Sequence, residues 1–262
     1  MNFQNKIRGF KEVWQFDNRL SLIFTKTFFP REKLHIYHYK GLDILIDHFA
    51  GDANGAREIL TSPMYRRFFP QMKLDGAINV LDLGANNGGF PLLLQVNKIP
   101  LKKVVSVELN PKTFVRLRFN LERNLPCPVV ALNAAICGKN ELLKLTLGEG
   151  SVSDSIYNSP PIQGQNYEVE GLTLDEVWAR HFRDETVDIC KIDIEGAEFD
   201  LFFQPSHQSL RKCRYLIMEI HERDDRKAED ILPRIENLGF VRQATTPDAD
   251  PTVHFFINSA FE

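Results

Sequence analysis

The chain has 262 residues, of which 43% are hydrophobic and 26% are charged, and its formal net charge at pH 7 is -3. This composition excludes a disordered or fibrous protein and is typical of a globular domain with a buried core. Because the net charge is slightly negative, no broad basic surface is predicted, and a nucleic-acid partner is not expected.

The cysteines and the N-terminus indicate a cytoplasmic protein. The four cysteines are scattered without a CxxC pair, at Cys127, Cys137, Cys190 and Cys213. They lie in or near apolar runs and are expected to be reduced, as in the cytosol. Charged residues interrupt the N-terminus, so no secretory signal is predicted. No apolar run reaches the roughly 18–20 residues of a transmembrane segment.

Residues 1–74 are predicted to be an extension of a main domain that occupies residues 75–262. Apolar residues between Trp14 and Phe24 predict an amphipathic helix. This helix would pack on the domain or on a partner subunit of a homo-oligomer, or lie on a membrane surface. The segment LHIYHYKGLDILID predicts two strands that turn at Lys40 and Gly41, and helical pieces interrupted by Pro63 follow. The boundary is expected at residues 74–78.

From Asn79 onwards, short apolar strands alternate with helices. Strands are predicted at residues 79–83, 104–108, 129–132, 188–193, 215–220, 240–243 and 254–258. Helices are predicted near Phe90, at residues 113–124, after Thr173, and at residues 198–208 and 226–238. The residues between the third strand and Thr173 are predicted to be non-helical.

This alternation predicts an α/β fold with a mostly parallel sheet that helices cover on both faces. The last two strands are separated only by a short loop, so they are expected to form an antiparallel hairpin. Five parallel units closed by such a hairpin resemble the Rossmann-like sheet of class I methyltransferases. Ordinary dinucleotide-binding domains lack this ending.

The sequence VLDLGANNGGF places a glycine-rich turn at the end of the first core strand. Glycine lets the backbone turn tightly and approach a nucleoside cofactor closely, which predicts cofactor contacts at Gly84, Asn86 and Gly88. Asn86 replaces the second glycine of the dinucleotide fingerprint, so a pyrophosphate would fit poorly. Asp82 instead suits the positive amino group of a methionine moiety, contacted through water.

The next strand ends at Glu108, about twenty residues after the glycine-rich turn, where an acidic side chain accepts hydrogen bonds from ribose hydroxyls. The competing interpretation is a surface carboxylate that caps the following helix. Asn110 and Pro111 already supply a helix-start signal, which favours the ribose role. Asn110 is therefore also placed beside the cofactor.

Two later strands end in charged motifs, KIDIEGAE and MEIHER. Asp193, Glu195, Glu219 and His221 are predicted to meet at the edge of the sheet where open α/β sheets bind their ligands. An imidazole titrates near neutral pH, so His221 is a candidate general base. A salt-bridge cluster without a catalytic role is the alternative.

In chain order, the motifs VLDLGANNGGF, VELNP, GLTLDEV, KIDIEGAE and MEIH resemble the FkbM family of methyltransferases. The resemblance implies the class I methyltransferase fold, S-adenosylmethionine as cofactor, and O-methylation of a hydroxyl on a sugar, glycan or other small natural product. By position it implies a cofactor loop at Asp82, Gly84, Asn86 and Gly88 and ribose recognition at Glu108. It places Asp193 and Glu195 at the reaction centre, with Asp193 also bordering the cofactor.

Two versions of the reaction are compatible with these residues. Either His221 or Asp193 removes the proton of the acceptor hydroxyl, or Asp193, Glu195 and Glu219 hold a Mg²⁺ that lowers the acceptor's pKa.

Residues 151–165, rich in Ser, Pro, Gly and Asn, are a candidate lid over the substrate or a simple connector. A nicotinamide-dependent oxidoreductase and a non-catalytic interaction protein are the alternative functions.

Overall fold

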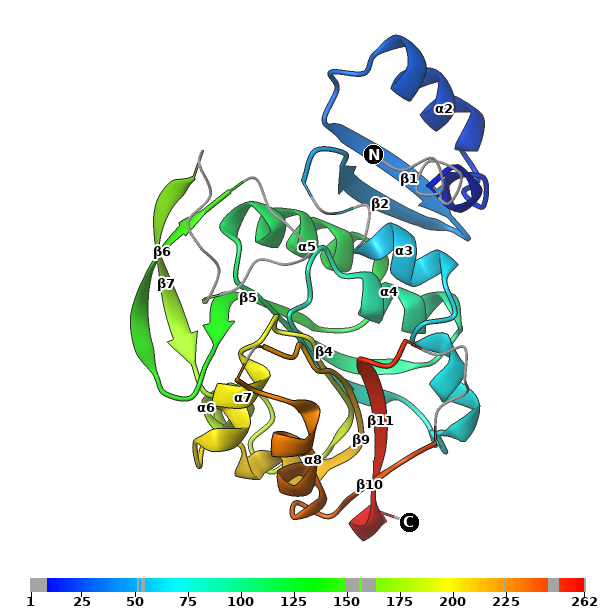
Figure 1. Ribbon diagram of the computed structural model, residues 1–262. Helices are drawn as coiled ribbons and strands as arrows, with labels where there is room; N and C mark the ends of the chain where they lie inside the picture. Colours follow the sequence, from blue (N-terminus) through cyan, green and yellow to red (C-terminus); the bar gives the residue numbers. More distant parts are fainter. Residues whose placement is uncertain are drawn as a thin grey trace.

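The computed structural model describes residues 9–50, 52, 55–148, 156, 164–223, 225–244 and 250–261 (Figure 1). Its main feature is a nine-stranded sheet in the order β10-β11-β9-β8-β3-β4-β5-β7-β6. These strands are β3 (Ile78–Leu83), β4 (Leu101–Glu108), β5 (Val129–Ile136), β6 (Glu141–Leu147), β7 (Gln165–Leu172), β8 (Val187–Ile192), β9 (Cys213–Glu219), β10 (Phe240–Arg242) and β11 (Val253–Asn258). The strands from β9 to β7 in this order run parallel to one another, and β6 and β11 are antiparallel to their neighbours.

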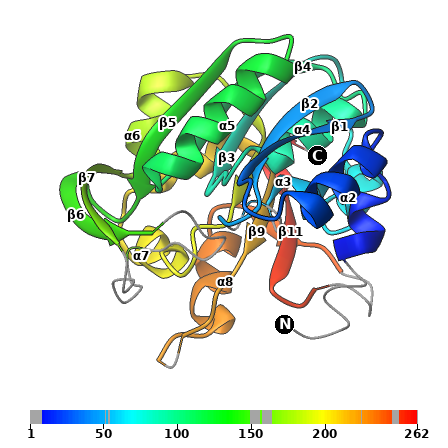
Figure 2. The ribbon, with the colours of Figure 1, turned by 90° about the horizontal axis from the view of Figure 1, so that it is seen from above.

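Helices cover both faces of the sheet, as Figures 1 and 2 show. On one face lie α4 (Gly89–Val96) and α5 (Pro111–Asn124), and on the other α6 (Leu174–His181), α7 (Glu198–Phe203) and α8 (Ala228–Glu236). Successive residues of β3 alternate between the two resulting cores, with Val80 in the first and Leu81 in the second. A strand buried on both faces explains why β3 reads as a continuous apolar run.

The predicted fold class is confirmed, because the six parallel strands β3, β4, β5, β7, β8 and β9 are followed along the chain by the antiparallel pair β10 and β11. The stretch after β5, expected only to be non-helical, contains a further hairpin of β6 and β7. Glu141 pairs with Gly171 at one end of this hairpin and Leu147 pairs with Gln165 at the other. The strands lie at the edge of the sheet and expose many of their side chains, so their hydrophobic pattern is weak.

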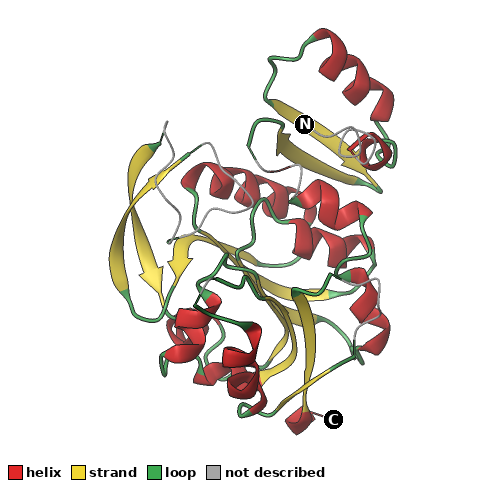
Figure 3. Cartoon of the chain, in the orientation of Figure 1, coloured by secondary structure: helices red, strands yellow, loops and turns green. Residues whose placement is uncertain are grey.

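The N-terminal residues form a separate two-stranded sheet with a helix beside it (Figure 3). Helix α2 (Arg19–Phe28) precedes β1 (Leu34–Tyr39) and β2 (Leu42–Asp47), and the helices α3 (Ala56–Thr61) and η2 (Arg66–Gln71) follow. Lys40 and Gly41 adopt positive φ angles of 48° and 86°, which confirms the predicted turn. The predicted boundary at residues 74–78 stays a prediction.

Side-chain amides of α5 attach the β1–β2 hairpin to the main sheet. Asn120 accepts a hydrogen bond from the Leu45 N–H at 2.7 Å and donates to the Leu45 carbonyl at 3.1 Å. Asn124 contacts the backbone of Asp43 in the same way. These bonds satisfy backbone groups at the open edge of β2. No helix among the described residues is long and apolar enough to cross a membrane.

Candidate active site

The loop after β3 brings the backbone close to the end of β8. Gly84 has a φ of +73°, and a Cβ atom there would lie 1.6 Å from the carbonyl oxygen of Asp193. Asn86 and Gly88 also have positive φ angles, of 48° and 92°. Only glycine fits at the crowded first position, since any side chain would push the two loops apart. The glycine-rich motif therefore brings the predicted cofactor loop against the predicted reaction centre.

Glu108, at the end of β4, links this loop to the start of α5 through its two carboxylate oxygens. Oε2 accepts a hydrogen bond from the Asn86 N–H at 2.9 Å, and Oε1 accepts one from the Asn110 N–H at 2.7 Å. Asn110 in turn caps α5 by accepting from the backbone N–H groups of Lys112 and Thr113. Glu108 is buried except for a small surface that lines a cavity. It thus holds the loop in place and also presents a carboxylate to that cavity.

Asp82 lies beneath the loop, and its carboxylate is completely buried beside Lys191. The Lys191 ammonium lies 3.5 Å from Asp82 Oδ1 and 3.0 Å from Asp193 Oδ2, and it donates to the Gly84 carbonyl at 2.8 Å. Burial raises the pKa of Asp82 to about 6, although Lys191 opposes this shift. Burial alone would lower the pKa of Lys191, but Asp193 and Asp82 raise it above its usual value. Lys191 is therefore a fixed positive charge under the site.

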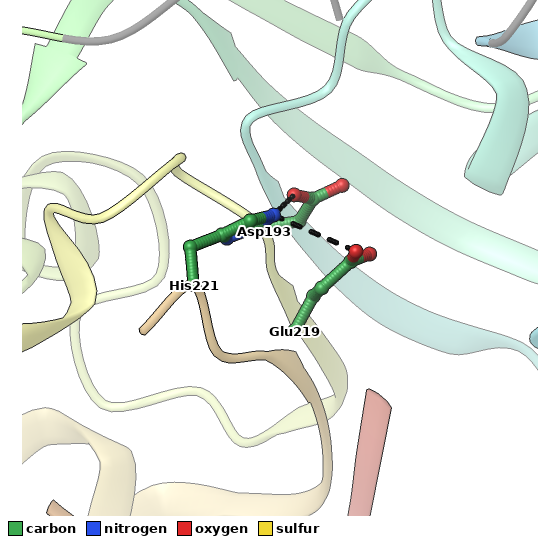
Figure 4. A group of neighbouring side chains, drawn as sticks. All are labelled: Asp193, Glu219 and His221. Carbon is green, nitrogen blue, oxygen red and sulfur yellow. Dashed lines mark ion pairs between the residues drawn. The ribbon is translucent and has the colours of Figure 1, made fainter. Parts of the chain in front are cut away.

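Four acidic side chains surround His221 at the ends of β8 and β9, and Figure 4 shows two of them. The imidazole Nε2 lies 3.5 Å from Glu195 Oε2, 3.5 Å from Glu219 Oε1 and 3.9 Å from Asp193 Oδ1. Asp193, Glu219 and His221 each offer a metal-ligand atom, and these atoms lie within 4.8 Å of one another. The predicted convergence of these residues is therefore observed.

The fourth carboxylate, Glu198, is fully buried and orients His221. Its Oε1 lies 3.1 Å from His221 Nδ1 and accepts a hydrogen bond from the Ile194 N–H at 3.0 Å. Its Oε2 accepts from the Gly196 N–H at 2.7 Å. Because an ionised carboxylate only accepts, the Nδ1 proton points to Glu198, and Nε2 is directed at the other three acids.

The cluster shifts the pKa values of His221 and Glu195, and the two shifts give these side chains different charges at neutral pH. Burial would lower the pKa of His221, but hydrogen bonds with Glu198 and Glu219 and the nearby acidic charges raise it to about 11. Burial raises the pKa of Glu195 to about 7; the charge of His221 opposes this rise, and Asp193 and Glu219 add to it. At neutral pH, His221 is a cation, and Glu195 is divided between its protonated and ionised forms.

A cavity of about 250 Å³ joins the cofactor loop to this cluster. The predicted residues that line it are Gly84, Asn86, Glu108, Asp193, Glu195 and Glu219. Apolar residues from the end of β5, from Ala134 to Ile136, line it as well. Asp82, Gly88 and Asn110, also predicted to bind the cofactor, are not among the residues that line this cavity. His221 adjoins it through Glu219 and borders a second hollow.

The N-terminal part of the chain supplies one wall of the cavity, which sequence reasoning did not anticipate. Gly55, Glu58, Ile59, Met64 and Tyr65 line it. The Tyr65 side chain is almost fully buried, and its hydroxyl donates a hydrogen bond to Glu219 Oε2 at 3.5 Å. No local motif marks Tyr65, because its partner lies 154 positions further along the chain. Most of the candidate lid, residues 151–165, lies outside the described residues.

Comparisons with known proteins identify the family but no close relative. No match is found among curated proteins. A solved FkbM methyltransferase from Methylobacillus flagellatus KT is 16% identical with a TM-score of 0.48, and the match covers 74% of this chain and 47% of that one. The chain thus spans about half of that protein's length.

Two further solved structures are similar over most of their length. A human methyltransferase 10 domain containing protein is 13% identical with a TM-score of 0.45, over 98% of this chain and 96% of that one. Fibrillarin from Aeropyrum pernix, in complex with S-adenosyl-L-methionine, is 12% identical with a TM-score of 0.44, over 87% and 85%. The model of the methyltransferase FkbM domain matches residues 82–242, which is more than half of the chain. The chain therefore belongs to the FkbM methyltransferase family.

Proposed function

We propose that this chain uses S-adenosylmethionine to methylate a hydroxyl group on a sugar, glycan or other small natural product. The observation that carries the proposal is the single cavity that connects Gly84, Asn86 and Glu108 with the cluster around Glu195. A methyl transferase needs the donor and the acceptor in line and shielded from water, and a shared cavity meets that need. Membership of the FkbM family supports methyl transfer as the chemistry.

The charge of the cavity supports S-adenosylmethionine rather than a dinucleotide. Five carboxylates line the cavity, from Glu58, Glu108, Asp193, Glu195 and Glu219, with Lys191 as the basic residue among the lining positions. An acidic lining attracts a cofactor that carries a sulfonium and an ammonium group, and it repels pyrophosphate. The exposed edge of Glu108 suits the ribose hydroxyls, and the apolar end of β5 suits the adenine ring.

We assign proton removal from the acceptor to Glu195. S-adenosylmethionine, when bound, would supply the methyl group on its sulfonium and leave as S-adenosylhomocysteine. The Glu195 carboxylate would take the proton that the acceptor hydroxyl loses. A pKa of about 7 suits a base that works near neutral pH. His221 is less suitable because it already carries its proton, with a pKa of about 11. Its charge, and that of Lys191, hold Asp193 and Glu219 in place.

The same charges argue against the Mg²⁺ version of the reaction. Asp193, Glu195 and Glu219 would be its ligands, since carboxylate oxygens suit that ion. However, the Lys191 ammonium lies 3.0 Å from Asp193, and the His221 imidazolium lies 3.5 Å from both Glu195 and Glu219. A Mg²⁺ at this position would have to displace these two cations from the carboxylates with which they already pair. We therefore propose a metal-independent transfer.

The reacting hydroxyl of the acceptor is proposed to lie in the first cavity beside Glu195, and the rest of the acceptor to extend towards a second hollow of about 600 Å³ that His221 borders on its other side. Its lining combines apolar side chains with polar ones from Glu222, Glu229, Arg242 and Thr252. His254 also lines it; this side chain is 96% buried, and its Nδ1 has no hydrogen-bond partner among the described residues. Burial lowers the pKa of His254 to about 4, so the ring is neutral at physiological pH. This lining favours an acceptor rich in hydroxyl groups.

The proposal can be tested in two stages with the purified chain. Calorimetry should show binding of S-adenosylhomocysteine in the micromolar range, roughly -8 kcal/mol at a Kd of 1 μM, and no binding of NADPH. Transfer of an isotope-labelled methyl group should then be measured on free sugars, nucleotide-linked sugars and glycans, with RNA as a comparison. O-methyl ethers survive mild alkali, whereas methyl esters are cleaved. NADPH binding without S-adenosylhomocysteine binding would reject the proposal in favour of an oxidoreductase.

The cellular site of this reaction is proposed to be the cytoplasm. All four cysteines are unpaired thiols, and three of them are buried. Reduced thiols are the usual state of cysteine in the cytosol. Labelling of the folded chain with a thiol reagent, before and after reduction, would reveal any disulfide that contradicts this assignment.

A further inference from the structure

The N-terminal segment exposes an unusual concentration of large apolar side chains. Of the fourteen large hydrophobic side chains that are exposed among the described residues, eight lie between residues 10 and 49. We call six of them the N-terminal strip: Phe10, Trp14, Leu20, Phe24, Phe28 and Phe29. Large exposed apolar patches mark interaction surfaces.

Helix α2, which carries part of the strip, lies on the outside of the molecule (Figure 1). In α2, Leu20, Phe24 and Phe28 recur every fourth residue and so share one face. The rings of Phe24 and Phe28 lie 4.7 Å apart. Towards the N-terminus, Arg19 stands over the ring of Trp14 at 5.3 Å, and Phe10 stacks on Trp14 at 5.6 Å.

The strip remains exposed although the other side of the same segment is well packed. Phe16 and Leu22 are buried, and the ring of Phe16 lies 4.8 Å from that of Tyr37. Asn18 donates a hydrogen bond to the Ile36 carbonyl at 2.8 Å. The segment therefore has two apolar faces. One packs against the rest of the fold, and the other stays exposed.

Charged residues around the strip indicate which partner would cover the second face. Between residues 9 and 34, five basic side chains are exposed, from Lys11, Arg19, Lys26, Arg31 and Lys33, against two acidic ones, from Asp17 and Glu32. Glu12, the remaining acid of this stretch, is buried against Arg57, with 2.9 Å between Oε2 and Nε. This local excess of positive charge contrasts with the net charge of -3 of the whole chain.

We propose that the N-terminal strip binds the surface of a membrane that contains anionic lipids. Exposed aromatic and leucine side chains flanked by Lys and Arg are the pattern of helices that lie in the headgroup region. A second copy of this chain fits less well, because a two-fold contact through the strip would bring the two sets of basic side chains face to face. The surface lies outside the proposed active site, so the proposal does not depend on methyl transfer.

Co-sedimentation with vesicles tests this proposal on the full chain. The protein should pellet with vesicles of phosphatidylcholine and phosphatidylglycerol, less with phosphatidylcholine alone, and less at high salt. The double variant Leu20→Glu with Phe24→Glu should bind about tenfold less. The matched control, Val115→Glu with Leu142→Glu, places the same charges on apolar side chains of α5 and β6 that are exposed to 57% and 61%. It should bind like the original chain.

Three results would overturn the proposal. The first is no pelleting of the original chain with anionic vesicles. The second is an equal loss of binding in the control variant. The third is a dimer in light scattering that dissociates only in the Leu20→Glu and Phe24→Glu variant, with no vesicle binding, which would assign the strip to a second copy of the chain. Thermal unfolding followed by circular dichroism checks that both variants remain folded.

Discussion

Replacing Glu195 by glutamine tests the most unusual electrostatic feature of the site. Burial raises the pKa of this carboxyl to about 7 against an ordinary value of 4.5; His221 partly offsets the rise, and Asp193 and Glu219 increase it. A difference of that size corresponds to roughly 3 kcal/mol of unfavourable free energy whenever Glu195 is ionised in the folded protein. Glutamine is nearly isosteric with the protonated acid and never ionises. The variant should therefore be more stable than the original chain at alkaline pH.

Whether stability rises or falls with pH depends on whether the folded or the unfolded chain holds the proton of Glu195 more tightly. Between pH 4.5 and about 7, the folded protein keeps a proton on Glu195 that the unfolded chain has released, so this group makes stability fall as pH rises. Above pH 7, the stabilisation by Glu195→Gln should reach up to about 3 kcal/mol, and near pH 4 it should be small. Urea denaturation at pH 4 and pH 8 measures both values.

The control is Glu122→Gln in α5, where the side chain is 62% exposed and faces Arg118 at 4.0 Å. Its effect should stay within about 0.5 kcal/mol at either pH. In the same Glu195→Gln protein, turnover of a verified acceptor should fall by about 10²-fold, since the proton acceptor is lost. A stability difference that is equal at both pH values, or a variant that is less stable at pH 8, would refute the electrostatic argument.

Three further substitutions test other parts of the site. Glu108→Ala should weaken S-adenosylhomocysteine binding by about 1–3 kcal/mol, and unchanged affinity in calorimetry would remove Glu108 from the cofactor site. Gly84→Ala should destabilise the fold by about 1–3 kcal/mol more than Gly76→Ala in urea denaturation, because both glycines have positive φ but no atom lies within 4 Å of a Cβ at Gly76. Asp193→Asn should lower turnover by about 10²-fold and leave cofactor affinity nearly unchanged, and normal turnover would place Asp193 outside the reaction centre. EDTA should not reduce the activity of the original chain, and a loss restored by Mg²⁺ would revive the metal-dependent version.

The sequence by itself determined the elements that local chemistry controls. The apolar runs of β3, β4, β8 and β9 are long and regular, so their burial and parallel arrangement could be predicted. The glycine-rich turn after β3 was also predictable, because few residues other than glycine adopt the required positive φ angles. Once these strands are parallel, their carboxyl ends must share one edge, and this placed Glu108, Asp193 and His221 near one another.

Only the tertiary structure decided which charges these residues carry and what surrounds them. Lys191 neutralises the buried Asp82 under the loop, and Glu198 fixes the proton of His221; these pairs depend on separations of a few ångströms. Tyr65 reaches Glu219 across 154 positions of the chain. A pKa follows from burial and from all neighbouring charges together, and a linear sequence specifies neither. For this reason the sequence favoured His221 or Asp193 as the base, whereas we propose Glu195 from the charges of its neighbours.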